Sequence, residues 1–341
     1  MRKGGSMNRH LGILLMITFV FFGGCKSDPE KMINAAAEGD IERVRSLLSA
    51  GVNINSSDEE GKTALIMASA NGREEAVRYL IDGGADIGKK DGSGKSAIMW
   101  AADRGQDSPI RALIAKGADA NEADVSGKSL LMIASIGGHD GTVKLLLDSR
   151  ADINRQDAKG WTAYMWAADN GKAGIVKMLA ERGANPDILD RQGMTALMHA
   201  VVKGDRTMTE TLIKNGSSVN VLYLADLQGF FNSGKMKYSP GAGKISRFEG
   251  KSALMLASER GDTAIMGFLI QKGAELNAEN DQGRTPLMLA AVKGKSGAVK
   301  LLLDNKANPD VKDDDNKTAL DYALKNGDPE SIRYLRDTQK K

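Results

Sequence analysis

Few residues of this chain combine the types and the spacing that a catalytic or ligand site requires. The segment Gly241-Ala242-Gly243-Lys244 is the nearest approach to a phosphate-binding loop. Such a loop needs a glycine five residues before its second glycine and a hydroxyl residue after its lysine, and these positions hold Tyr238 and Ile245. The segment therefore does not predict nucleotide binding.

Candidate metal ligands are equally sparse. His139 and His199 have no cysteine or second histidine at ligand spacing, which argues against zinc and favours structural hydrogen bonding. Methionines recur once in thirty-three residues, and their sulfur atoms could suggest a copper site. Helices of successive repeats pack roughly 8–10 Å apart, however, which is too far for several sulfur atoms to bind one ion. The run Asp313-Asp314-Asp315 lacks the glycine and distal glutamate of a calcium loop. We expect no catalytic, cofactor or metal site.

The elements that would position any site repeat with a fixed period. The phrase at residues 61–65, Gly-Lys-Thr-Ala-Leu, returns in related form at 94–98 and 127–131. Counted from these glycines, the eighth, twelfth and twentieth positions of nine units are uniformly alanine, glycine and leucine. The alanines are Ala35, Ala68, Ala101, Ala134, Ala167, Ala200, Ala257, Ala290 and Ala323. This period indicates an array in which each unit buries its apolar face against its neighbours.

One unit contains the signals for two short helices and a hairpin. Thr63 is suited to cap a first helix, and Gly72 to reverse the chain after it. A second helix then carries an apolar stripe and ends at Gly83-Gly84, and a turn around Asp91-Gly92 leads into the next unit. The sequence predicts a mainly α solenoid of nine such units.

These repeats resemble the ankyrin family. The resemblance is carried by Gly-x-Thr-Pro-Leu at 283–287, by Thr195-Ala196-Leu197 and by the ending Lys116-Gly117-Ala118-Asp119-Ala120-Asn121. It implies an ankyrin-repeat solenoid over residues 30–341, with helix-turn-helix and β-hairpin units. Where that family usually has a histidine after the leucine, this chain mostly has methionine, which we expect to fill the space by packing alone.

The first 24 residues have the order of a secretion signal. Arg2, Lys3 and Arg9 precede an apolar run from Leu11 to Phe22, which is shorter than the roughly 20 residues of a membrane-spanning helix. The following Gly-Gly-Cys25 resembles a bacterial lipobox, and Cys25 is the only cysteine. We expect a lipoprotein signal peptide (1–24), a lipidated Cys25 with a short tether (25–29) and a place in the bacterial cell envelope. A short membrane anchor and an unmodified thiol are the alternatives.

The charge of the chain argues against nucleic acid as a partner. The sequence holds 47 Lys and Arg against 44 Asp and Glu. The leader contains three of the basic residues and no acidic one, so the remaining chain is neutral. A nucleic-acid-binding domain would show a basic excess.

An insertion interrupts the period between the sixth and seventh units. Gly193 and Gly250 are separated by one period plus 24 residues, which places extra chain within 221–249. This segment combines glycines and basic residues with four aromatic residues that we predict to contact a partner: Tyr223, Phe230, Phe231 and Tyr238. Alternatively, they only cover the neighbouring hairpins.

The family resemblance also implies binding residues on the repeats, at hairpin tips and at the ends of first helices. Carried over by position, the central set is Trp161, Asp169, Asn170, Arg191 and Met194. Trp161 stands where five other units have lysine, so an exposed ring there is a candidate hot spot. The alternative is a ring lying flat on the next unit. Trp100 and Trp166 are interpreted as core.

Together these features predict a non-catalytic protein-protein interaction module, anchored to a bacterial envelope membrane and binding a protein partner through its concave face and the insertion. The alternative is a structural spacer or protective scaffold for an envelope enzyme.

Overall fold

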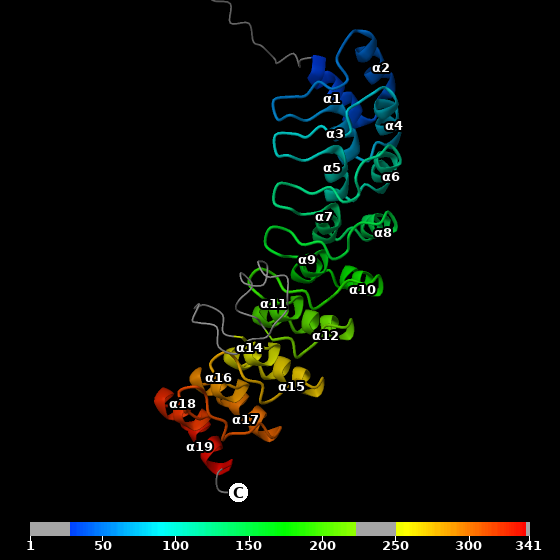
Figure 1. The fold of residues 1–341 in the computed structure, drawn as a ribbon. Coiled ribbons are helices and arrows are strands. Elements are labelled where there is room, and N and C mark those ends of the chain that lie inside the picture. The colour runs from blue at the N-terminus through cyan, green and yellow to red at the C-terminus, as the bar shows by residue number, and fades with distance from the viewer. Residues whose placement is uncertain (1–27, 223–249, 339–341) are drawn as a thin grey trace, which may run out of the picture.

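The computed structural model describes residues 28–222 and 250–338, and within them it forms a single array of stacked helix pairs (Figure 1). The first helices of the units stack into an inner layer, next to the hairpins. They are α1 (Asp28–Glu38), α3 (Ala64–Ala70), α5 (Ala97–Asp103), α7 (Leu130–Gly137), α9 (Ala163–Asp169), α11 (Ala196–Lys203), α14 (Ala253–Arg260), α16 (Pro286–Val292) and α18 (Ala319–Asn326).

The second helices form an outer layer on the side away from the hairpins (Figure 1). They are α2 (Ile41–Ser49), α4 (Glu74–Asp82), α6 (Asp107–Ala115), α8 (Asp140–Asp148), α10 (Ala173–Glu181), α12 (Arg206–Lys214), α15 (Thr263–Gln271), α17 (Ser296–Asp304) and α19 (Pro329–Thr338). These nine pairs confirm the predicted solenoid. No helix in the two described ranges is long and apolar enough to cross a membrane.

The first helices begin where the sequence predicts. The Thr63 hydroxyl accepts a hydrogen bond from the Ile66 backbone N–H (3.2 Å), and Ser129, Thr162, Thr195, Ser252, Thr285 and Thr318 cap their helices in the same way. Each cap satisfies a backbone donor that has no partner within the helix. Repetition of this local chemistry sets the start of nearly every unit.

The methionines that recur at the sixth position of the units are buried, as expected for core residues, but packing is not their only contact. Met198 Sδ accepts a hydrogen bond from the Thr195 backbone N–H (3.5 Å), and Met255 Sδ accepts one from Ser252 (3.4 Å). The expectation of packing alone is therefore wrong for these two. The sulfur, a weak acceptor, satisfies a backbone N–H at the start of the helix.

The hairpins project from the inner layer and bond to one another. Three of them contain an isolated antiparallel bridge, and consecutive hairpins are joined by bonds such as Arg191 N–H to Lys159 O (3.0 Å). Gly160 has φ +80°, and a Cβ there would lie 2.6 Å from the Arg191 nitrogen. Glycine is thus required for both the turn and the close approach of the hairpins.

Stacking continues across the insertion. At four uninterrupted junctions an asparagine accepts a backbone N–H of the next unit, as Asn154 Oδ1 does from Asn185 (2.8 Å). Asn220 Oδ1 accepts from Glu275 in the same way (2.9 Å), and its amide also donates to Gly273 O (3.0 Å). The sixth and seventh units are therefore joined as neighbours although 24 additional residues separate them in sequence.

Candidate protein-binding face

An aspartate at the base of a hairpin organises the surface between the hairpins and the inner helices. Where the fourth unit meets the fifth, Asp157 Oδ1 accepts the backbone N–H groups of Lys159 (2.8 Å) and Trp161 (2.9 Å), which closes the turn. Its Oδ2 accepts the indole N–H of Trp166 on α9 (2.9 Å). One buried carboxylate therefore fixes both the hairpin and an aromatic ring on the helix.

The same arrangement recurs wherever a donor side chain stands nine residues after the aspartate. Asp91 accepts Trp100 Nε1–H (2.7 Å), Asp190 pairs with His199 Nε2 (2.7 Å), and Asp313 accepts the Tyr322 hydroxyl. In units where this position is apolar, such as Ile133 and Leu289, the contact is absent. Trp100 and Trp166, interpreted as core from the sequence, are instead partly buried rings on the hairpin side.

Three rings form a stack along the array in the fifth and sixth units. The Trp161 ring lies 4.6 Å from the Trp166 centroid and 4.8 Å from that of His199, tilted by 52° and 51°. Trp161 Nε1–H also donates to Asp190 Oδ2 (3.0 Å). Trp161 is therefore partly buried against the next unit, while the rest of its ring faces solvent.

Asp190 holds two of these rings at once. Its side chain is fully buried, and its Oδ2 contacts both Trp161 Nε1 and His199 Nε2. A carboxylate only accepts hydrogen bonds, so His199 carries a proton on Nε2. The expected structural bonding of His199 is confirmed, and the same holds for His139, whose Nε2 lies 2.9 Å from Asp103 O.

In Asp91 and Asp313, hydrogen bonds to the carboxylate together outweigh the effect of burial on the pKa. Burial alone would raise the pKa of Asp91. Bonds from the Ser93 side chain, the Lys95 backbone and the Trp100 indole outweigh it and lower the pKa below its ordinary value. The pKa of Asp313 is lowered in the same way, with burial opposed by Tyr322, Lys317 and Arg284. These two carboxylates therefore stay ionised at neutral pH and continue to accept their hydrogen bonds.

Lysine and arginine side chains lie over the exposed parts of the rings. The Lys95 ammonium is 4.6 Å from the Trp100 centroid, with Arg104 at 5.7 Å. Lys128 lies 4.8 Å from the Trp166 centroid and Lys159 lies 5.7 Å from it. These are cation–π distances, so the surface presents alternating aromatic and positively charged groups.

The structure brings together only part of the binding set predicted on the repeats. Asn170 ends α9 and its amide donates to Trp166 O (2.9 Å), beside the ring stack. Asp169 bonds Lys203 of the next unit (3.1 Å), and Arg191 is exposed at a hairpin tip. Met194 is only 8% exposed, so it offers little surface to a partner.

The other predicted contacts, Tyr223, Phe230, Phe231 and Tyr238, lie outside the described residues, as do Cys25 and residues 1–24. Their roles stay predictions.

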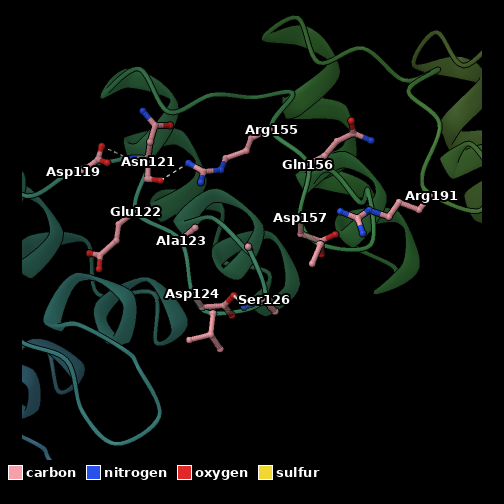
Figure 2. Close-up of a pocket in the computed structure, with 13 residues that line it drawn as sticks. Asp119, Asn121, Glu122, Ala123, Asp124, Ser126, Arg155, Gln156, Asp157 and Arg191 are labelled. Atoms are coloured by element: carbon pink, nitrogen blue, oxygen red, sulfur yellow. Dashed lines mark hydrogen bonds between the residues drawn. The ribbon is translucent and has the colours of Figure 1, made fainter. Parts of the chain in front are cut away.

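A shallow hollow of about 740 Å³ adjoins this face along the hairpins that join the third unit to the fourth and the fourth to the fifth (Figure 2). Asn121 and Arg155 lie together on its wall, where the guanidinium donates to Asn121 O (2.7 Å), and Arg191 lies at its far end (Figure 2). Val125, at a hairpin tip, is 91% exposed. An open, polar hollow of this kind suits contact with another macromolecule better than enclosure of a small molecule.

Sequence reasoning missed the contact of cations with the Trp100 ring and the exposure of Val125. A sequence signal for the position of the Trp100 ring does exist. An aspartate stands nine residues before Trp100, as one does before Trp166, and each aspartate bonds the indole at the hairpin. No comparable signal marks Val125. Among the residues that the structure describes, no group of three or more His, Cys, Asp or Glu side chains could hold a metal ion.

Comparison with known families gives one result. The family model described as ankyrin repeats (3 copies) matches residues 32–124, 79–157, 131–222, 237–313 and 254–341, which together cover most of the chain. A search of curated proteins finds no match.

Proposed function

This chain belongs to the ankyrin-repeat family, and from that premise we propose that it is a non-catalytic module that binds a protein partner. Ankyrin-repeat proteins are generally interaction scaffolds. The observation that supports this function most directly is the Trp166–Trp161–His199 stack, whose rings are held in place by Asp157 and Asp190 while remaining partly exposed. Rigid, partly exposed tryptophan rings are typical of interface hot spots.

The polar groups of this site favour binding over catalysis. The Asp190–His199 pair resembles the orienting half of a catalytic triad. However, Asp190 Oδ2 is shared with Trp161, and no described serine, threonine or cysteine side chain bonds the His199 ring. Without a nucleophile the pair holds the ring stack.

We further propose that Cys25 is lipidated and that residues 1–24 are a signal peptide, which would place the repeats at a bacterial envelope membrane. The lipobox-like Gly-Gly-Cys25 after an apolar run supports this. The proposed surface comprises Trp161, Asp169, Asn170 and Arg191, together with the aromatic residues of the insertion.

A spacer role is the second candidate. It is favoured by the bonds between hairpins and by the asparagine bonds between units, which tie neighbouring repeats into a continuous rod.

The test is capture of partners from solubilised membranes of the native organism, with identification by mass spectrometry. The mature domain would be used intact, with Trp161→Ala, and without residues 223–246. Tyr79→Ala is the control, because Tyr79 belongs to α4, a helix of the outer layer on the side away from the hairpins (Figure 1).

We expect the intact and control proteins to retain the same envelope protein and Trp161→Ala to retain much less. If only the protein without residues 223–246 fails to retain the partner, the binding site lies in the insertion. Capture of nothing by the intact protein would favour the spacer. A Trp161→Ala protein that loses several kcal/mol of stability while binding normally would contradict the assignment of Trp161 to the interface.

A further inference from the structure

Two groups of cations surround two tryptophan rings on the hairpin side of the third to fifth units. Lys62, Lys95 and Arg104 lie 5.9, 4.6 and 5.7 Å from the Trp100 centroid. Lys128 and Lys159 lie 4.8 and 5.7 Å from the Trp166 centroid. We call these seven residues the cationic strip.

The charges of the strip are only partly neutralised by the protein. Lys62 pairs with Glu60, and Lys95 pairs with Asp103 (3.1 Å). Arg104, Lys128 and Lys159 form no ion pair with any described residue.

The nearest buried carboxylates are already engaged. Asp91 and Asp157 accept the indole N–H groups and the backbone N–H groups of their own hairpins. A partner would therefore meet the cations and ring edges of the strip, together with the two solvent-accessible carboxylates, Glu60 and Asp103, that pair with two of its lysines.

The spacing of the two groups selects an elongated ligand. Trp100 and Trp166 stand two repeats apart, or roughly 16–20 Å at the usual distance between packed helices. An extended polypeptide covers about 20 Å in six residues and one repeat in about three. In a segment that lies along the strip, every third residue would therefore face the next repeat.

From this geometry we propose that the cationic strip binds an extended acidic segment of the protein partner, with carboxylates at about every third residue. The proposal rests on the proposed function and names the chemistry of the partner. Carboxylates would approach Arg104, Lys128 and Lys159, which lack ion pairs, and would form charge-assisted hydrogen bonds with them.

Single-stranded nucleic acid is also anionic, but it fits the strip less well. Its affinity depends on bases stacking on open aromatic faces. Here Lys95 and Lys128 already lie within 5 Å of the two ring centroids, so a base would have to displace a cation. The chain without its leader also has no basic excess.

The test uses the mature protein and a fluorescein-labelled peptide of sequence Glu-Ser-Gly-Glu-Ser-Gly-Glu, with binding followed by anisotropy at low and at physiological salt. A peptide of the same composition with its three glutamates adjacent tests the spacing, and an oligothymidine strand tests the competing ligand. The protein variants are Lys128→Glu/Lys159→Glu and a control with the same change at Lys144 and Lys177. These two lysines are exposed on the outer helices α8 and α10 and give the same change in net charge.

We expect the spaced peptide to bind more tightly than the clustered one. The Lys128→Glu/Lys159→Glu protein should bind it at least about tenfold more weakly, because opposed like charges at an interface cost several kcal/mol. The outer-helix variant should bind normally. Unfolding curves recorded for both variants separate loss of binding from loss of fold.

Three results would overturn the proposal: equal weakening by the outer-helix variant, tighter binding of the oligothymidine, or no peptide binding at low salt. None of these touches the proposed function, which fails separately if the intact protein captures no partner. Conversely, a captured partner whose binding survives Lys128→Glu/Lys159→Glu would refute the strip while leaving the interaction module in place.

Discussion

At the scale of single residues, the aspartates at the hairpin bases have the most connected role. Asp157 closes a turn through its Oδ1 and holds a tryptophan through its Oδ2. Asp190 holds two rings from two different units. A side chain only four atoms long thereby couples the backbone of a hairpin to the surface that the repeat presents.

This coupling predicts a dependence of stability on pH. The pKa of Asp91 is lower in the folded chain than in the unfolded chain, so its ionised form stabilises the fold at neutral pH. That contribution is fully present above the unfolded pKa, near 4, and is lost as the pH falls through the lower folded value. Asp313 contributes in the same direction.

We therefore expect the free energy of unfolding, measured with urea, to fall as the pH decreases below about 4. An Asp91→Asn protein should show a shallower fall. Asparagine already occupies the equivalent position 280 and closes its turn through the same backbone bonds, so the turn should still form. The bond from the Trp100 indole N–H would be lost, because an asparagine NH2 group cannot accept it, so the variant should also be less stable at neutral pH. An Asp91→Asn curve parallel to that of the unaltered protein would contradict the role assigned to this carboxylate.

At the scale of the element, the helices of this chain could be predicted from sequence more fully than its surface. The period, the caps and the apolar stripes are local signals, and residues such as Thr63 act as their type predicts. The contact between Asp157 and Trp166 depends on the hairpin folding back over the following helix, which no propensity or period records. The burial of Met194 was missed for the same reason.

Two glycines, one in a hairpin and one in an outer helix, provide a matched pair of substitutions. Gly160→Ala should destabilise the fold by roughly 1–3 kcal/mol, because its φ is +80° and the new Cβ would meet the Arg191 nitrogen at 2.6 Å. Gly174→Ala, within α10 where a Cβ would meet nothing within 4 Å, should stabilise it by roughly 0.5–1 kcal/mol. Thermal and urea unfolding would measure both. Equal effects would show that the turn does not require glycine.

At the scale of the whole molecule, the array depends on contacts between neighbouring units only, as expected for a solenoid. The ends differ accordingly. Leu324 is 47% exposed in the last unit, whereas at the same position Ala291 of the preceding unit is fully buried by its neighbour. The unfolding of one part of the rod is therefore coupled to the unfolding of another part only through the junctions between neighbouring units.

The junction at the insertion gives a test of this coupling. Asn220→Ala removes two bonds between units, whereas Asn154→Ala removes one at an uninterrupted junction. We expect losses of about 2 and about 1 kcal/mol.

Two signals would follow the unfolding of these variants. All three tryptophans precede Asn220, so their fluorescence reports the earlier units, and circular dichroism reports the whole array. The two transitions should separate most in Asn220→Ala. Coincident transitions in both variants would show that Asn220 does not govern the coupling.

The bonding of Asn220 to Glu275 and Gly273 has a further consequence for how the protein can be made. Because these contacts join the two parts of the rod through space, the peptide chain need not run unbroken between them. Two separately expressed polypeptides that meet within 223–249 should find each other and complement into one rod. The insertion would then be a place to open the chain, attach a reporter or exchange one half for another.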